Sequence, residues 1–190
     1  MQIYGSIFYQ EFTDFIEVET VGFDDNTGNF LKQYRNNNGA TLKGAELSAA
    51  YWLTSYVQIS TKHGYVTGKT SAHEYVRTIT PYEGSLELDY DDETFSAYGL
   101  LSWATAMSRV PVCQDNLGII GACAKASSWI ALDVGGSYKP ISQLKLSANL
   151  MNLFDRNYTR YQDVAGILAT DTHYMSQAGR YFTLNMRYEF

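Results

Sequence analysis

The amino-acid sequence predicts an all-β fold, an antiparallel transmembrane β-barrel of about eight strands. Apolar and polar residues alternate with a period of two along most of the 190 residues, which is the pattern of strands with two unlike faces. The connections between these strands alternate strictly between long polar segments and short turns. Outer-membrane barrels have short turns at one end and long loops at the other.

The last segment of the chain shows the alternation most clearly. One face of this strand is apolar and aromatic and carries Phe182, Leu184, Met186, Tyr188 and Phe190. The opposite face is polar and carries Thr183, Asn185, Arg187 and Glu189. Lipid outside and water inside would produce this pattern. A water-soluble sandwich would also produce it, so the connections must decide between the two folds.

The predicted connections favour the barrel. Long polar segments are expected near 19–35, 64–80, 109–127 and 159–178, and the short turns fall near 54–55, 91–93 and 140–142. The opening strand, about Gln2 to Val18, alternates less cleanly. We therefore expect all long segments on one side of the sheet, with Thr54, Asp92 and Ser142 on the other.

Composition agrees with strands and limits the possible partners. Aromatic residues reach 15%, with 16 Tyr, and no stretch approaches the roughly 18 apolar residues of a membrane helix. The net charge of -6 argues against nucleic acid as a partner. Cys113 and Cys123 lie ten positions apart in a polar segment. We expect a local disulfide in an extracellular loop, with two free thiols as the alternative.

Catalytic motifs are weak, and we expect no enzyme. Residues 64–70 (GYVTGKT) resemble a phosphate-binding loop, but the spacing is one residue short and no helix pattern follows. Ser71, His73 and Glu74 fall in one predicted loop, where adjacent positions do not hold the geometry of a catalytic triad. Glu83, Glu87 and Asp89 are interpreted as polar residues facing a wet barrel interior.

The three histidines, His63, His73 and His173, lie in or beside predicted extracellular loops. His173 is followed by Tyr174 and Met175, and imidazole, phenolate and thioether groups can all ligate haem iron. His173, Tyr174 and His73 are therefore candidate ligand-binding residues. The alternative is that each is a solvated loop residue without a ligand.

Two segments resemble the TonB-dependent outer-membrane receptors. Residues 149–158 (NLMNLFDRNY) are similar to the N-L-F-D-x-x-Y signature of their penultimate strand, and residues 177–190 resemble their closing P-G-R-x-F strand, with Ala178 where Pro is usual. Residues 36–47 look like their N…G-x-E strand. The terminal Phe190 resembles the aromatic residue that closes such barrels. The resemblance implies a receptor in the bacterial outer membrane, in contact with its lipid.

Within this family, residues 138–141 and 158–164 resemble the haem and haemoglobin receptor branch. The resemblance implies an importer of haem, taken up free or from a haem protein, with haem as transported ligand and no prosthetic group. It also implies a TonB complex as partner, contacted through an N-terminal part that this sequence lacks. A ferric siderophore or a metal is the alternative cargo on the same fold.

The resemblance also implies that residues 1–190 are the C-terminal portion of a longer barrel. Such receptors have about 22 strands around a plug domain, and neither the plug nor an export signal is recognisable here. We therefore expect a fragment that is inactive alone. The alternative from another class is a self-contained eight-stranded structural or adhesive barrel.

Overall fold

A computed structural model describes the chain except for residues 25, 28, 37, 115–119 and 170–174. Its main element is an antiparallel sheet of eight strands in the order β1-β4-β5-β6-β7-β10-β11-β12. The strands are β1 (Gln2–Phe12), β4 (Ala40–Trp52), β5 (Val57–Thr70), β6 (Glu83–Asp91), β7 (Phe95–Ala104), β10 (Trp129–Ile141), β11 (Leu144–Met151) and β12 (Tyr181–Tyr188). The sheet is open, with β1 and β12 at its two edges.

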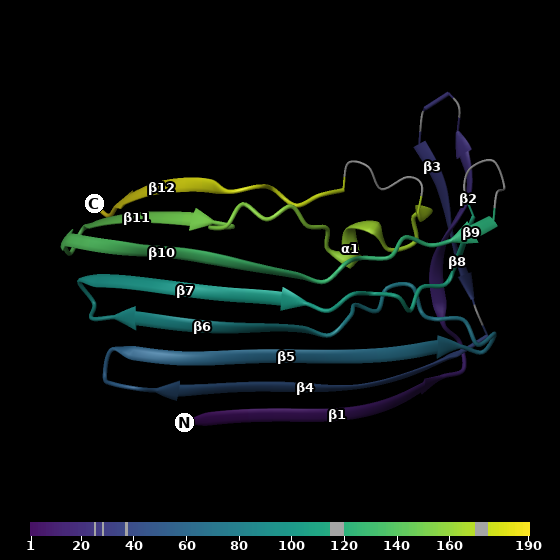
Figure 1. Ribbon diagram of the computed structural model, residues 1–190, viewed down its shortest axis with the longest axis horizontal. Coiled ribbons are helices and arrows are strands. Elements are labelled where there is room, and N and C mark those ends of the chain that lie inside the picture. The colour runs from purple at the N-terminus through teal and green to yellow at the C-terminus, as the bar shows by residue number, and fades with distance from the viewer. Residues whose placement is uncertain (25, 28, 37, 115–119, 170–174) are drawn as a thin grey trace.

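The connections confirm the expected topology. Figure 1 shows the three short turns, β4 to β5, β6 to β7 and β10 to β11, at one end of the sheet together with both chain termini. The long connections all lie at the opposite end. Each strand therefore pairs with its sequence neighbour within the main sheet, which is the arrangement of an up-and-down barrel wall.

Two smaller hairpins and one helical turn lie at the long-loop end. β2 (Ile16–Asp24) pairs with β3 (Asn29–Asn36), and β8 (Val112–Gln114) pairs with β9 (Ile120–Ala122). The turn α1 (Tyr161–Val164) belongs to the last long connection. Among the described residues, no helix is both long and apolar enough to cross a membrane.

The sequence prediction was wrong about the first strand and the length of the third. The predicted opening strand is two strands in different sheets, because β1 ends at Phe12 and the chain turns before Ile16. In that turn the Asp14 carboxylate accepts a hydrogen bond from Asn36 Nδ2 at 2.7 Å. The loop was expected to begin at residue 64, but β5 continues to Thr70. The strand is longer because its end pairs with the start of β4.

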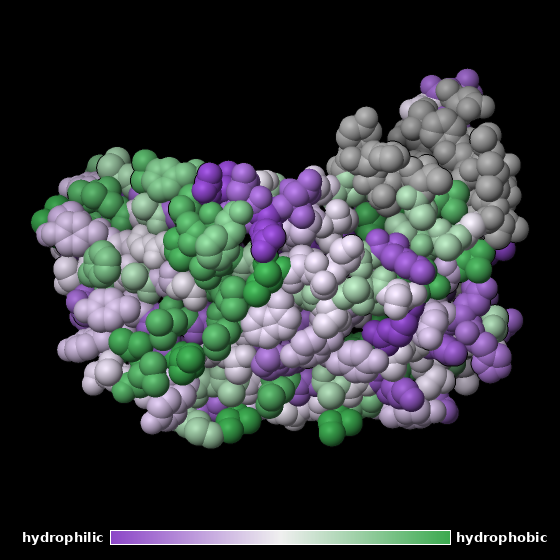
Figure 2. Space-filling view, in the orientation of Figure 1, coloured by the Kyte–Doolittle hydropathy of each residue, from purple (hydrophilic) through white to green (hydrophobic). Residues whose placement is uncertain are grey.

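The register places side chains of one kind on one face across all eight strands. Residues paired across an antiparallel ladder point to the same side, and the ladder pairs run from Ile3 to Ala49, from Ala49 to Thr61 and onward through Leu86 and Leu101. We call this the apolar face; it also carries Ile7, Leu47, Ile130, Leu146, Leu184 and Met186. Figure 2 shows apolar side chains gathered over the strands, with more polar side chains toward the loop end.

Aromatic side chains mark the short-turn end of the apolar face. Tyr51, Tyr90, Phe95, Tyr138 and Tyr188 occupy this level. The rings of Tyr90 and Phe95 have centroids 6.2 Å apart. β12 ends at Tyr188, and the ring of Phe190 packs edge-on against that of Tyr188 at 5.1 Å. A band of apolar residues bordered by aromatic rings is the outer surface of a membrane barrel.

Asp92 organises the short turn between β6 and β7. Its carboxylate accepts the backbone N–H groups of Phe95 at 2.7 Å and Thr94 at 3.1 Å, and also the hydroxyl of Tyr90 at 2.8 Å. The backbone donor of Phe95, followed by the Tyr90 hydroxyl, lowers the pKa of Asp92 below its ordinary value. An aspartate that accepts its own turn's N–H groups is a common way to close such a connection.

Asn152 closes the end of β11, within the N-L-F-D segment. It is only 4% exposed and has a positive φ of 51°, which asparagine tolerates better than most residues. Its Nδ2 donates to the carbonyls of Arg156 at 2.9 Å and Ala178 at 3.1 Å, and its Oδ1 accepts the Arg156 N–H at 2.9 Å. Its own N–H donates to Asp133 at 2.7 Å. Asn152 thus joins β10, β11 and the approach to β12.

We predict that Asn152→Ala lowers the free energy of unfolding by roughly 2–4 kcal/mol, because it removes three side-chain hydrogen bonds at a buried position. The measurement is a urea unfolding curve followed by tryptophan fluorescence of the detergent-folded protein. Asn157→Ala, at an exposed neighbouring position, is the matched control and should change little. Equal unfolding midpoints for both variants would contradict this role for Asn152.

Candidate functional site

The face opposite the apolar face, which we call the polar face, contains a pocket of about 610 Å³ near the loop end. Its wall combines carboxylates, cations, hydroxyls and aromatic rings. Side chains on this face that line it include Tyr4, Glu46, Ser48, Lys62, Glu83, Ser85, Ser102 and Trp129, joined by Arg160 and Gln162 from the last long connection. The pocket carries two carboxylates and two cations, so it is polar without a strong net charge.

The last long connection is attached to this pocket. Gln162 Nε2 donates to Glu83 Oε1 at 3.2 Å. The Trp129 ring stacks on Tyr158 with centroids 4.6 Å apart, and the Arg160 guanidinium lies 5.8 Å from the Trp129 centroid. Aromatic rings and charged groups side by side can bind a polar ligand with an apolar surface.

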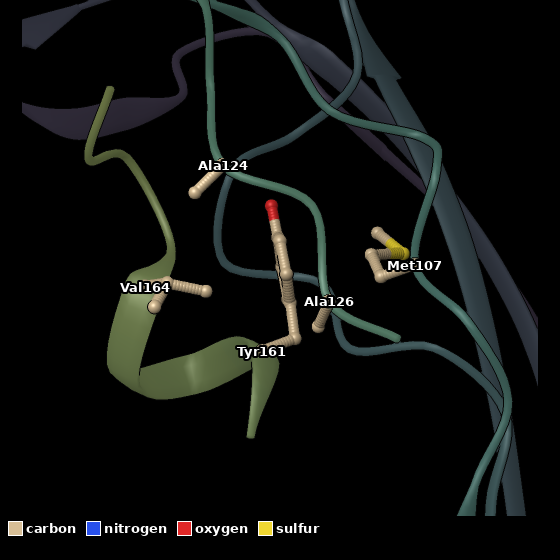
Figure 3. Packing of buried hydrophobic residues seen from close by; sticks show 5 residues of the cluster. All are labelled: Met107, Ala124, Ala126, Tyr161 and Val164. Atoms are coloured by element: carbon tan, nitrogen blue, oxygen red, sulfur yellow. The ribbon is translucent and has the colours of Figure 1, made fainter. Parts of the chain in front are cut away.

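A small hydrophobic cluster, the loop core, holds the long connections together. Met107, Ala124, Ala126, Tyr161 and Val164 form it, and all are nearly inaccessible to solvent. Figure 3 shows the Tyr161 ring standing among the other four side chains. The connection after β7, the segment after β9 and the turn α1 are therefore fixed against one another.

Arg77 extends this assembly to two more connections. The Tyr161 hydroxyl donates to the Arg77 carbonyl at 2.9 Å, and burial raises the pKa of that hydroxyl above its ordinary value, an effect that Arg77 partly offsets. Arg77 Nη1 donates to the Val18 carbonyl at 2.9 Å, and the Arg77 N–H donates to Glu17 at 3.3 Å. Tyr161 and Arg77 thus tie the β2–β3 hairpin to the last connection.

Cys113 and Cys123 are joined by a disulfide that links β8 to the end of β9. Their Cα atoms are 4.9 Å apart, within the range of about 4.4–6.8 Å usual for disulfides. Both cysteines are buried. The bond lies at the long-loop end, where the Cys123 region pairs with Leu168 of the last connection.

The structure separates the three histidines. His73 lies exposed in the loop after β5, with φ of 64°, and its N–H donates to the Thr70 carbonyl at 2.9 Å. His63 is in the middle of β5 on the apolar face, paired with Leu47, so its expected place beside a loop is wrong. Its Nδ1 lies 2.6 Å from the Tyr82 hydroxyl and its Nε2 lies 2.8 Å from Thr61 Oγ1. His173 and Tyr174 lie outside the described residues.

Met175 and the predicted carboxylates have definite places. Met175 packs against the loop core. Glu83, Glu87 and Asp89 lie on the polar face, because they alternate with Leu86 and Leu88 along β6. In the part of the chain that the structure describes, no group of three His, Cys, Asp or Glu side chains is placed to hold a metal ion.

The sequence analysis did not single out Lys62, Trp129, Arg160 or Tyr161. Lys62 and Trp129 occupy polar-face positions of their strands, and the alternation of each strand contained that signal. Arg160 and Tyr161 reach their sites through the path of a long connection, for which no periodic pattern exists. These features define the wall of an antiparallel transmembrane β-barrel with a polar interior pocket and interlocked long loops.

Known structures share this fold. A copper transporter, OprC, has 25% sequence identity and a TM-score of 0.77, and it covers 100% of this chain. A ferric enterobactin receptor (PfeA) mutant from Pseudomonas aeruginosa has 21% identity, 99% coverage and a TM-score of 0.71. The FrpB iron transporter from Neisseria meningitidis has 15% identity, 99% coverage and a TM-score of 0.68. The chain spans 29% of the length of each of these three structures.

A profile of the family described as TonB dependent receptor-like, beta-barrel, matches residues 2–153. No curated protein sequence matches the chain. The chain belongs to the TonB dependent receptor-like β-barrel family, and both its fold class and the family predicted from the sequence are confirmed. The resemblance to the haem branch is not confirmed, because the structures named above are a copper transporter, a ferric enterobactin receptor and an iron transporter.

We predict that Tyr161→Phe destabilises the long-loop end by about 1 kcal/mol through one lost hydrogen bond. Tyr161→Ala should cost about 3–5 kcal/mol, because it also leaves a cavity. Amide hydrogen exchange of residues 105–111 and 120–126 should be faster in Tyr161→Phe than in wild type, and faster still in Tyr161→Ala. Exchange in β10 and β11 should stay unchanged in both variants. Equal exchange in wild type and Tyr161→Ala would show that the loop core does not hold these connections.

Proposed function

We propose that this chain forms part of the wall of a TonB-dependent receptor in the bacterial outer membrane that imports a metal or a metal complex. The observation that carries the proposal is the continuous register of eight strands, with an apolar band on one face and a polar pocket on the other. The family consists of receptors and transporters, so we propose binding and transport without catalysis.

The open edges of the sheet support a wider barrel. The outer edges of β1 and β12 have no strand partner within the described sheet, and unpaired backbone N–H and C=O groups are not stable in lipid. We infer that further strands complete the wall and that a plug and a TonB contact lie in the rest of the receptor. A self-contained eight-stranded barrel would need β1 to pair with β12, which the structure does not contain.

Haem, a ferric siderophore and a metal ion are the candidate cargoes. Metal or metal-complex import is supported by neighbours described as a copper transporter, a ferric enterobactin receptor and an iron transporter. The haem proposal rests on the motif resemblance and on loop histidines, of which His73 is exposed in the connection between β5 and β6. His173 and Tyr174 remain haem-ligand candidates from the sequence alone.

The orientation of the receptor gives the first test. A membrane-impermeant maleimide added to intact cells should label Ala72→Cys, in the exposed loop after β5, and should not label Ser55→Cys, in the exposed β4–β5 turn. Both variants should react after the outer membrane is permeabilised. The wild-type protein, whose cysteines are disulfide-bonded, is the unlabelled control. Labelling of Ser55→Cys in intact cells would overturn the proposed orientation.

The cargo is tested separately with the complete receptor. If haem is the cargo, His73→Ala combined with His173→Ala should weaken haem affinity by at least tenfold and shift the Soret band, because two candidate iron ligands are lost. His63→Gln, on the apolar face, is the control and should leave haem binding unchanged. Growth on a ferric siderophore but not on haem as sole iron source would remove haem and leave the receptor assignment in place.

A further inference from the structure

Three cations, Lys43, Lys69 and Arg109, are found at the long-loop end of the apolar face. Lys43 of β4 pairs with Tyr9 on one side and with Thr67 on the other. Lys69 is two residues beyond Thr67 on the same face of β5, so the two lysines are diagonal neighbours, about 7–8 Å apart at this level of an antiparallel pair. Arg109, from the connection after β7, contacts Tyr65 on the same face of β5.

Arg109 is held in position by β5. Its Nη1 donates to the Tyr65 hydroxyl at 3.0 Å, its Nη2 donates to the Val66 carbonyl at 3.4 Å, and its guanidinium carbon lies 4.9 Å from the Tyr65 ring centroid. Tyr65 is the other diagonal neighbour of Lys43. Among the described residues, these bonds use two of the five donors of a guanidinium, which leaves donors of Arg109 for a further acceptor.

The two lysines are exposed, and neither has a carboxylate partner among the residues that the structure describes. Among the described residues neither Lys43 nor Lys69 forms an ion pair, and Lys69 Nζ lies 5.1 Å from the Tyr75 ring. One carboxylate, Glu11, lies on this face at the same level, where it accepts the Tyr9 hydroxyl at 2.5 Å. Among the described residues at this level of the face, three cations therefore stand against one carboxylate, which leaves a positive surplus.

The three cations lie at the long-loop boundary of the apolar band. Leu47 and Ile7, on the same face nearer the short turns, are 45% and 90% exposed. Lys43 is four residues beyond Leu47 along β4, about 13 Å at the usual rise of a strand. A lysine on the lipid face is costly at the membrane midplane and nearly neutral at the interface. On a surface that faces lipid, this position corresponds to headgroup depth, next to the exposed side chains of Leu47 and Ile7.

We propose that Lys43, Lys69 and Arg109 bind the phosphate of a phosphorylated lipid headgroup in the leaflet on the long-loop side. Lysine and arginine form strong charge-assisted hydrogen bonds with phosphate oxygens, and the acyl chains of the same lipid would cover Ile7 and Leu47. A lipid fits both parts of this surface, whereas a free phosphate ion would satisfy only the cations. The inference rests on the proposed function in one respect, namely that the apolar face meets lipid.

The test uses the complete receptor in phosphatidylcholine vesicles containing a few per cent of lipid A or of the same lipid with its phosphates removed. Native mass spectrometry of the extracted receptor counts retained lipid, and fluorescent lipid A gives the affinity by titration. The variants are Lys43→Gln with Lys69→Gln, and Arg109→Gln. The matched control is Lys32→Gln with Lys125→Gln, two exposed lysines of the loop end that do not belong to the cluster.

We expect wild type and the control to retain lipid A and to bind the dephosphorylated lipid weakly. Each cation removed should weaken lipid A binding by about fivefold, the usual contribution of one basic residue near an anionic membrane surface. Equal affinity of the Lys43→Gln, Lys69→Gln variant and wild type, or equal binding of the two lipids, would overturn the proposal. Displacement of lipid A by millimolar inorganic phosphate would also overturn it, because the site would then be one for a free anion.

The experiment distinguishes a failure of the proposed function from a failure of the lipid-site proposal. A receptor whose apolar face does not meet lipid would fail to insert, and its strands would be digested by protease in both kinds of vesicle. If the receptor inserts normally but binds both lipids equally, only the lipid-site proposal is overturned and the proposed function stands. Thermal midpoints measured in detergent without anionic lipid show whether a variant has lost binding through misfolding, and we expect these midpoints to be unchanged.

Discussion

The backbone hydrogen-bond register of the eight-stranded sheet is the constraint on which the rest of the structure depends. Because side chains alternate along a strand and pair across a ladder, the pairing register determines the face on which every side chain of a strand lies. The pairs Leu47–His63 and Leu86–Leu101 lie on one continuous face from β1 to β12. A slip of one residue in any strand would bring polar side chains into the apolar band and apolar ones into the pocket.

The long connections follow a different physical rule. They have no ladder to define them, so they are held by a few buried side chains and one covalent bond. Tyr161 and Arg77 connect segments more than eighty residues apart, and the Cys113–Cys123 disulfide closes the hairpin beside them. This concentration of contacts fixes the loops above the pocket, where a ligand entering from the loop side must pass if the proposed function is correct.

The two faces of the sheet also divide the charged residues by role. Charges on the polar face, such as Lys62 and Glu83, are in a pocket that water can fill, and they need no special partner. Charges on the apolar face occur only near its boundary among the pairs described here, as with Lys43 and Lys69. His63 is a polar residue nearer the middle of that face, and hydrogen bonds to Tyr82 and Thr61 occupy both of its ring nitrogens.

The sequence by itself determined the strands, their faces and the alternation of short and long connections, because each of these is a local pattern with a period of two. It correctly assigned Glu83, Glu87 and Asp89 to the polar face, and the N-L-F-D signature pointed to the family. The same reasoning failed where no period exists: it joined β1 to β2, ended β5 too early and placed His63 beside a loop. Only the tertiary structure decided that Asn152 joins three elements, that Tyr161 is the centre of the loop core, and that Arg109 reaches Tyr65 of β5. These are contacts between segments distant in the chain, and they depend on the register and on the paths of long connections, which local alternation does not specify.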